Sequence, residues 1–156
     1  MTFFKFLILP LFVLCSATVL LAQGTQVAFG ALRQDTSLPV EVTSENLSVD
    51  QTTGKAIFTG NVVVGQGEMR LSAQEVQVVY RQDQNGIERL EATGGVTLVS
   101  GPDAAEAERA DYNIDSGTIV MTGNVLLAQG LSTISSDKMT VRLNEGTAQM
   151  SGSVKT

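Results

Sequence analysis

Short segments of alternating apolar and polar residues run from Leu38 to the end of the chain, and glycines interrupt them about every five to ten residues. Alternation with a period of two places one set of side chains on a buried face of a strand, and glycines at such intervals are typical of turns. No window has a convincing helical stripe, although the Ala and Glu content of Asp103 to Asp111 makes it the best helical candidate. The pattern predicts an all-β fold.

An internal repeat organises these predicted strands. Its copies are Thr59-Gly60-Asn61-Val62, Thr93-Gly94-Gly95-Val96, Thr122-Gly123-Asn124-Val125 and Ser151-Gly152-Ser153-Val154, with glycines 34, 29 and 29 residues apart. Each unit of about 29 residues predicts a strand, a turn and a second strand that passes through the motif glycine. The longer copy carries a polar hairpin tip around Arg81 to Gly86. Repeats of this length usually stack and bury a continuous core together.

Alignment of the copies separates the two faces of the predicted sheet, because nearly all positions of one parity are apolar. The candidate interior residues are Val40, Val42, Leu47, Val49, Ala56, Phe58, Val62, Val64, Val76, Val78, Leu90, Val96, Leu98, Tyr112, Ile114, Ile119, Met121, Val125, Leu127, Met139, Val141 and Met150. The motif glycine has the same parity, and a missing side chain there lets a strand bend sharply. We therefore expect a bent, wrapping sheet.

The beginning of the chain predicts export. Lys5 is followed by the almost wholly apolar run from Phe6 to Ala22, which has the layout of a secretory signal. We expect cleavage after Gly24, which divides the chain into a signal peptide (1–24), a flexible segment (25–36) and one β domain (37–156). An uncleaved membrane anchor is the alternative, since the apolar run is near the lower limit for spanning a bilayer.

The charge and the residue composition limit the partners and the chemistry that the chain can have. Removal of the predicted signal takes Lys5 away and leaves nine of the 10 Lys and Arg against all 16 Asp and Glu, a formal charge of 9 − 16 = −7. This balance disfavours nucleic acid as a partner. There is no histidine, and the single cysteine, Cys15, lies in the predicted signal. We therefore predict no catalytic residue, no metal site, no cofactor and no enzymatic activity.

The apolar stripe allows two interpretations. The first is a sealed hydrophobic core of the kind that every β-sandwich has. The second is a groove for acyl chains, because the inward residues are mostly small or flexible and include few aromatic ones. The residue pattern alone favours the sealed core.

Several segments resemble the LptA (OstA-like) family of periplasmic lipopolysaccharide-transport proteins, and together they cover most of the chain after the predicted signal. The resemblance lies in Asp35, Leu38-Pro39-Val40-Glu41-Val42, Leu47 to Asp50, Phe58 to Val64 with Gln66-Gly67, Ser72 to Val78, Val120 to Val125, and Ser136 to Thr140. It implies an open β-jellyroll of stacked antiparallel strands that shelters the lipid A acyl chains of lipopolysaccharide, with the candidate interior residues as its groove.

The resemblance also implies an assembly. Members join end to end with further copies, with an LptC-like inner-membrane protein and with an LptD-like outer-membrane translocon, so that lipopolysaccharide crosses the periplasm. Such joining is β-augmentation at unpaired strand edges. The candidate edges are the strand around Val40 and Val42 and the last strand, Ala148 to Val154. The alternatives are an anchored LptC-like component, a structural β-repeat protein without a ligand, and an enzyme acting on envelope sugars.

Overall fold

The computed structural model describes residues 24–30, 34–83 and 85–156. These residues form one ten-stranded antiparallel sheet. Its strands are β1 (Thr25–Ala28), β2 (Glu41–Thr43), β3 (Asn46–Asp50), β4 (Lys55–Gln66), β5 (Met69–Tyr80), β6 (Ile87–Ser100), β7 (Asp103–Asn113), β8 (Thr118–Gln129), β9 (Ser132–Arg142) and β10 (Thr147–Ser151). Within the described ranges, no helix has the length and apolar character needed to span a membrane.

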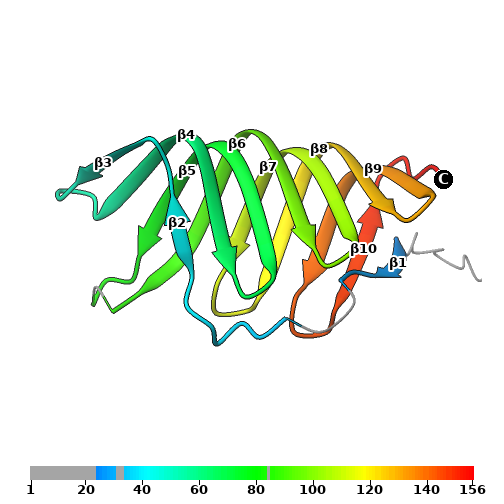
Figure 1. The fold of residues 1–156 in the computed structure, drawn as a ribbon, viewed down its shortest axis with the longest axis horizontal. Coiled ribbons are helices and arrows are strands. Elements are labelled where there is room, and N and C mark those ends of the chain that lie inside the picture. The colour runs from blue at the N-terminus through cyan, green and yellow to red at the C-terminus, as the bar shows by residue number, and fades with distance from the viewer. Residues whose placement is uncertain (1–23, 31–33, 84) are drawn as a thin grey trace, which may run out of the picture.

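The strands β4 to β10 follow one another in space as they do in sequence, each paired with the next (Figure 1). At one end of the stack β4 pairs with both β2 and β3, and at the other end β10 pairs with β1. The prediction of an all-β open sheet of stacked antiparallel strands is confirmed.

Each long strand that contains a copy of the motif bends at its motif glycine. In β4 the pairing register with β5 shifts between Thr59 and Val62, where Gly60 and Asn61 have φ angles of 82° and 45°. Two successive residues in the left-handed region form a bulge and turn the strand; glycine and asparagine are the residues that adopt this region most easily. Gly123 and Asn124 of β8 repeat the geometry with φ angles of 84° and 46°. We call these bends corners.

An acidic side chain covers most of the corners. A Cβ atom added to Gly60 would lie 2.5 Å from Glu45 Oε2, and Asn61 Nδ2 donates a hydrogen bond of 2.5 Å to Glu45 Oε1. The same arrangement recurs in β8, where Asn124 Nδ2 donates to Glu108 Oε1 at 2.6 Å. The corner therefore needs a glycine both for its backbone angle and for the close approach of this side chain.

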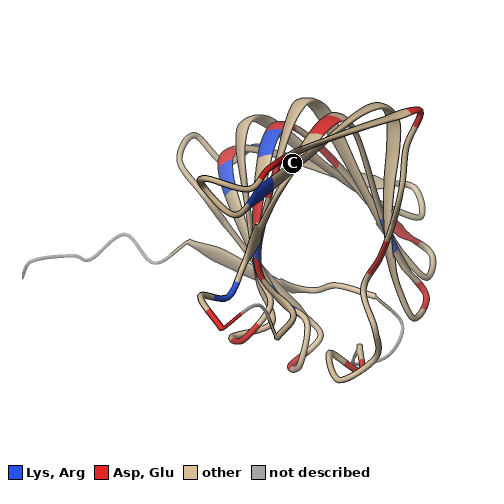
Figure 2. Cartoon of the chain, turned by 90° about the vertical axis from the view of Figure 1, so that its left-hand side faces the viewer, with Lys and Arg blue, Asp and Glu red and all other residues tan. Residues whose placement is uncertain are grey.

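The corners divide the sheet into two facing arms. One arm ends at the turns around Gly54, Gly86, Gly117 and Gly146, and we call it the Gly117 arm; the other ends at the turns around Gly67, Gly101 and Gly130, and we call it the Gly101 arm. Viewed end-on in Figure 2, the strands wrap around a central space, which buried apolar side chains from both arms fill. The side of the molecule opposite the corners, where the two rows of turns face each other, is the mouth.

The best helical candidate in the sequence is a strand, in agreement with the all-β prediction. Asp103 to Asp111 belongs to β7, because its alanines alternate with polar residues at strand spacing. Ala105 and Ala107 are buried, while Glu106 and Glu108 are exposed. The period of two, rather than helix propensity, decides this segment.

Two expectations about the ends also need correction. The described part of the segment 25–36, expected to be flexible, contains β1 and the buried Phe29, although the domain boundaries themselves stay a prediction. The last strand, expected to offer a free edge, pairs with β9 on one side and with β1 on the other. The predicted signal lies outside the described residues, except for Gly24.

The corner geometry predicts that Gly123→Ala destabilises the protein more than Gly95→Ala. The two glycines have φ angles of 84° and 86°, but only Gly123 would place its Cβ atom 2.8 Å from another Cβ, that of Glu108, whereas Gly95 has open space. We expect Gly123→Ala to lower the free energy of unfolding in urea by about 1–3 kcal/mol more than its control. Equal losses for the two variants would contradict the close contact as a cause.

Candidate functional site

The structure brings most of the predicted interior residues together between the two arms. Sixteen of them are at most 2% exposed, namely Ala56, Val62, Val64, Val76, Val78, Leu90, Val96, Leu98, Tyr112, Ile119, Met121, Val125, Leu127, Met139, Val141 and Met150. Val40, Val42, Phe58 and Ile114 are partly buried against them. Leu47 and Val49 are 55% and 60% exposed. A role for these residues in contacting lipid stays a prediction.

The apolar interior is continuous along the stack. Val64 pairs with Leu71 across β4 and β5, and pairs of inward residues continue strand by strand to Met150 of β10. Met121, Met139 and Met150 are directly opposed on β8, β9 and β10. Methionine is flexible and polarizable, so such a row can change its packing more easily than a row of branched side chains.

The interior ends in an exposed apolar face at β3. This strand pairs with β4 on one side, and it lies at one end of the stack (Figure 1). Leu47 and Val49 have the parity of the partly buried Phe58 and the buried Ala56 opposite them, but nothing in the described chain covers them. An unpaired strand edge beside exposed apolar side chains is typical of a surface that receives another strand.

The mouth is crossed by residues 24–30 and 34–39, which we call the N-terminal strap. The Phe29 N–H donates to Gly146 O at 2.9 Å, and its side chain is 2% exposed within the core. The Gly30 N–H donates to the Asp103 carboxylate at 2.7 Å. Gly146 and Asp103 belong to different arms, so the strap is bonded to both sides of the mouth.

The second part of the strap repeats this bridging. The Gln34 N–H donates to Leu143 O at 3.1 Å on the Gly117 arm, and Gln34 Nε2 donates to Ser100 Oγ at 2.9 Å on the Gly101 arm. Thr36 Oγ1 and Asn144 Oδ1 are 2.8 Å apart. Figure 1 shows this segment passing along the turns toward β2.

A buried polar pair joins the two arms directly. The Tyr112 hydroxyl donates to Gln66 Oε1 at 2.5 Å, and Gln66 Nε2 donates to Thr36 O and Leu38 O at 3.0 and 2.9 Å. Burial raises the pKa of Tyr112 to about 12, partly opposed by the hydrogen bond to Gln66. These groups tie both arms and the strap into one network that closes the mouth.

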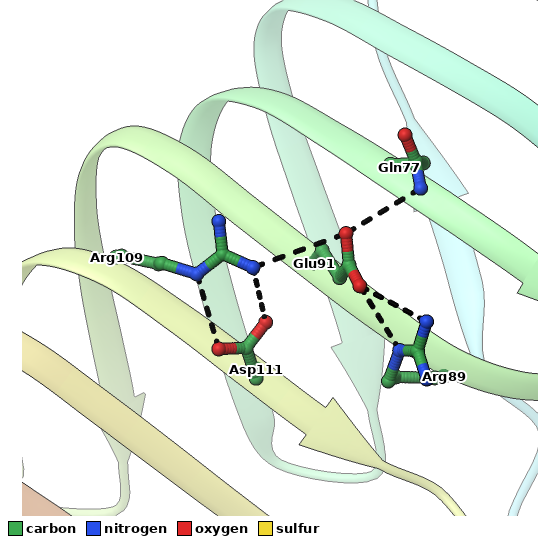
Figure 3. A network of polar contacts seen from close by, with 5 residues as sticks. All are labelled: Gln77, Arg89, Glu91, Arg109 and Asp111. Atoms are coloured by element: carbon green, nitrogen blue, oxygen red, sulfur yellow. Dashed lines mark hydrogen bonds and ion pairs between the residues drawn. The ribbon is translucent and has the colours of Figure 1, made fainter.

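The outer face of the sheet carries a charged network among polar and scattered apolar residues. Figure 3 shows Glu91 at the centre of a polar network, with Arg89 at 3.0 Å and Arg109 at 3.9 Å. Arg109 also forms an ion pair of 2.8 Å with Asp111. Asp111 of β7 lies directly opposite Glu91 of β6. The arginine therefore offsets the repulsion between two opposed carboxylates, although exposed pairs of this kind contribute little stability.

Sequence reasoning missed Phe29, Gln66 and the acidic residues at the corners. Phe29 lies in a polar stretch without strand alternation, so the pattern gave no reason to place it in the core. Glu45 and Glu108 each precede the asparagine of a motif by 16 residues. That shared spacing was the available signal for the corner contacts.

Comparison with known proteins places these features in a family. The profile described as LptA/(LptD N-terminal domain) LPS transport protein matches residues 41–152. An uncharacterized protein of Rhizobium meliloti is 33% identical over 112 residues, which cover 67% of this chain and 60% of that protein. The lipopolysaccharide export system protein LptA of Haemophilus influenzae is 35% identical over 83 residues, covering 53% of this chain and 46% of the relative. The chain thus spans about half of the length of these relatives.

Two further matches extend the comparison. The LPS-assembly protein LptD of Sodalis glossinidius is 33% identical over 82 residues, which are 51% of this chain and 10% of that protein. The crystal structure of LptH, described as the LptA homologous periplasmic component of the lipopolysaccharide transport device from Pseudomonas aeruginosa, superposes with a TM-score of 0.67. It covers 77% of this chain and 87% of LptH at 20% identity, so this likeness shows the fold.

The buried tyrosine predicts a loss of stability in alkali. A tyrosine with a pKa of 10.0 when unfolded and about 12 when folded holds its proton more tightly in the folded state. Its stabilising contribution is therefore complete below pH 10 and decreases as the pH rises to about 12, by at most about 1.4 kcal/mol per pH unit. We expect the loss of unfolding free energy in this range to be smaller in Tyr112→Phe, measured in urea at pH 9 and pH 11.

The same variant has a second expected effect at neutral pH. Tyr112→Phe leaves Gln66 Oε1 buried without its donor and should cost about 1–3 kcal/mol. Tyr80→Phe is the control, because Tyr80 is 39% exposed. An identical loss of stability with pH in the parent and in Tyr112→Phe would show that Tyr112 does not titrate as described.

Proposed function

Because the chain belongs to the LptA/LptD N-terminal domain family of lipopolysaccharide-transport proteins, as the match over residues 41–152 shows, we propose that it is a non-catalytic carrier of lipopolysaccharide. In this proposal the protein resides in the periplasm and forms part of a bridge between the inner and the outer membrane. Its task is to shelter the acyl chains while the sugars stay in water.

The observation that carries this proposal is the continuous apolar interior of a single bent sheet. It runs from β3, where Leu47 and Val49 are exposed, to the methionines Met121, Met139 and Met150. Acyl chains are long and apolar, so a row of small or flexible apolar side chains suits them. Charged residues of the network around Glu91 lie on the opposite face of the sheet.

The interior is filled by side chains, so lipid must separate the two arms to enter. The corners join the arms through continuous backbone, whereas the mouth is held by side-chain and strap hydrogen bonds. The arms can therefore separate at the mouth by the loss of hydrogen bonds alone, whereas at the corners the continuous backbone keeps them joined. Lipid would then move along the interior without any chemical step, driven by energy supplied elsewhere in the pathway.

Assembly end to end would extend the interior across the periplasm. The free edge of β3 offers backbone N–H and C=O groups for β-augmentation. A second copy, an LptC-like inner-membrane protein and an LptD-like outer-membrane translocon are the proposed partners. The LptD relative supports the last of these, since part of it resembles this chain.

A second candidate function is a structural β-repeat protein of the envelope without a ligand. The filled interior favours it, because sixteen predicted interior residues are at most 2% exposed. The two candidates differ in whether lipopolysaccharide ever contacts the inward side chains.

The lipid proposal predicts photo-crosslinking from inward positions alone. A photoreactive side chain at Met139, which is 0% exposed, should crosslink to lipopolysaccharide, as should one at Phe58 or Met121. The same probe at the neighbouring Thr140, which has outward parity, should crosslink weakly because it faces water. Crosslinks confined to Thr140 or to outward Thr97 would contradict the carrier function and favour the structural one.

The assembly proposal predicts that Leu47→Asp prevents association of the purified chain. A charge on this apolar end face cannot be buried in a new interface without a large desolvation cost. Because Leu47 is 55% exposed, the fold should remain intact. Size exclusion with light scattering should show concentration-dependent growth for the parent and for the outward control Ser48→Asp, but not for Leu47→Asp; equal growth of all three would rule out this end face.

A further inference from the structure

Strand β1 covers the edge of β10 that would otherwise be free. Thr25 pairs with Met150 and Val27 with Ala148 in antiparallel register. The strand is only four residues long. Before it, Gly24 approaches so closely that an added Cβ would lie 2.5 Å from Met150 O.

The covering strand and the closure of the mouth belong to one continuous piece of chain. β1 leads directly into Phe29, which is buried in the core, and into Gly30, whose N–H is bonded to Asp103. Removal of β1 from β10 would pull on both of these contacts. The same segment therefore occupies an assembly edge and holds the two arms together.

The β3 strand of a second copy fits this edge better than β1 does. Along the stack neighbouring strands alternate in direction, so a β3 strand placed beside β10 continues the antiparallel order. In the register that β1 now uses, Leu47 would take the place of Thr25 opposite Met150, and Val49 would take the place of Val27 opposite Ala148. Both incoming residues are more than half exposed in the single copy.

The exchange leaves the number of main-chain pairs nearly unchanged, because β1 has four residues and β3 has five. The difference lies in the side chains. A leucine replaces a threonine against Met150, and the covering of Leu47 and Val49 offsets the uncovering of Val27 and Phe29. At a high local concentration of the second copy, its β3 strand therefore replaces β1 beside β10.

We propose that β1 is an internal substitute for the β3 strand of a second copy, and that its replacement withdraws Phe29 and the Gly30 bond to Asp103 and so weakens the closure of the mouth. Uptake of lipid is thereby coupled to assembly, so that a joined copy opens more readily than a single copy. This inference rests on the function proposed above, and it adds the device by which an isolated copy keeps its apolar interior out of water.

A disulfide that fixes β1 to β10 tests the coupling. Gln26 and Gln149 are directly opposed on the outer face, so Gln26→Cys with Gln149→Cys can form the bond. The full chain also carries Cys15→Ser, which removes its single native thiol. The matched control is Thr140→Cys with Gln149→Cys, which ties the same residue of β10 to β9, a strand that the exchange does not displace.

Two measurements are made on the parent, the locked variant and the control, each with and without dithiothreitol. One is the light-scattering mass as a function of protein concentration, and the other is the amount of lipopolysaccharide retained after size exclusion. We expect the oxidised locked variant to stay at the mass of one copy and to retain at least about tenfold less lipopolysaccharide than the control. Reduction should restore both properties to the level of the parent.

The outcomes separate this inference from the proposed function. A parent that neither assembles nor retains lipopolysaccharide overturns the proposed function and the inference with it. A functional parent with a locked variant that assembles as the control does shows that β1 is not displaced. A locked variant that stays single but retains lipopolysaccharide normally shows that the mouth opens independently of β1.

A substitution in the strap tests the opposite direction. Phe29→Ser removes the aromatic anchor and should shift both assembly and lipopolysaccharide retention to lower protein concentration. Phe29→Leu is the control, since it keeps an apolar side chain in the core. Weaker assembly and retention by a folded Phe29→Ser variant would contradict the role of Phe29 as a closure.

Discussion

The close contact between a motif glycine and the side chain that covers it is the constraint on which the rest of the structure depends. At each corner two successive residues adopt left-handed backbone angles, and at Gly60 and Gly123 an acidic side chain comes within 2.5 Å of the place where a Cβ atom would be. Without the bend, these strands would form a flat sheet with one apolar face in water. With it, the sheet folds over and its two halves bury that face against each other.

The regular spacing of the corners has a consequence for the interior. Because they fall at the same place in successive strands, the bends align and produce two long arms with one continuous apolar space between them. In such a stack, each strand covers the apolar side chains of the strand before it. The apolar side chains of the first and last strands must be covered by another segment or by another protein, and this requirement links the fold to assembly.

The two ends of the stack meet this requirement differently. At β3 the chain leaves Leu47 and Val49 exposed, whereas at β10 it supplies β1 from its own N-terminal segment. The N-terminal strap, to which β1 belongs, also joins the two rows of turns through Asp103, Ser100 and Leu143. The same strap therefore protects the edge of β10 and helps to close the mouth. A ligand that enters through the mouth must displace the contacts of this strap.

The sequence by itself determined the parts of the molecule that depend on local periodicity. The period of two assigned inward residues such as Val62, Met121 and Met139 correctly, and the recurrence of Thr-Gly-Asn-Val located the bends, because side-chain parity and glycine at left-handed angles are properties of short segments. The alanine and glutamate content of Asp103 to Asp111 made it the best helical candidate, but it forms β7, as the all-β prediction requires.

Tertiary structure alone decided what happens at the ends and at the mouth. The pairing of Thr25 with Met150, the burial of Phe29 and the bond from Tyr112 to Gln66 join residues that are far apart in the chain. No repeat or alternation encodes such contacts, because each occurs once and depends on how the folded arms meet. Whether the apolar stripe is open or closed therefore followed from the strap, which the pattern of the sequence did not distinguish from a free segment.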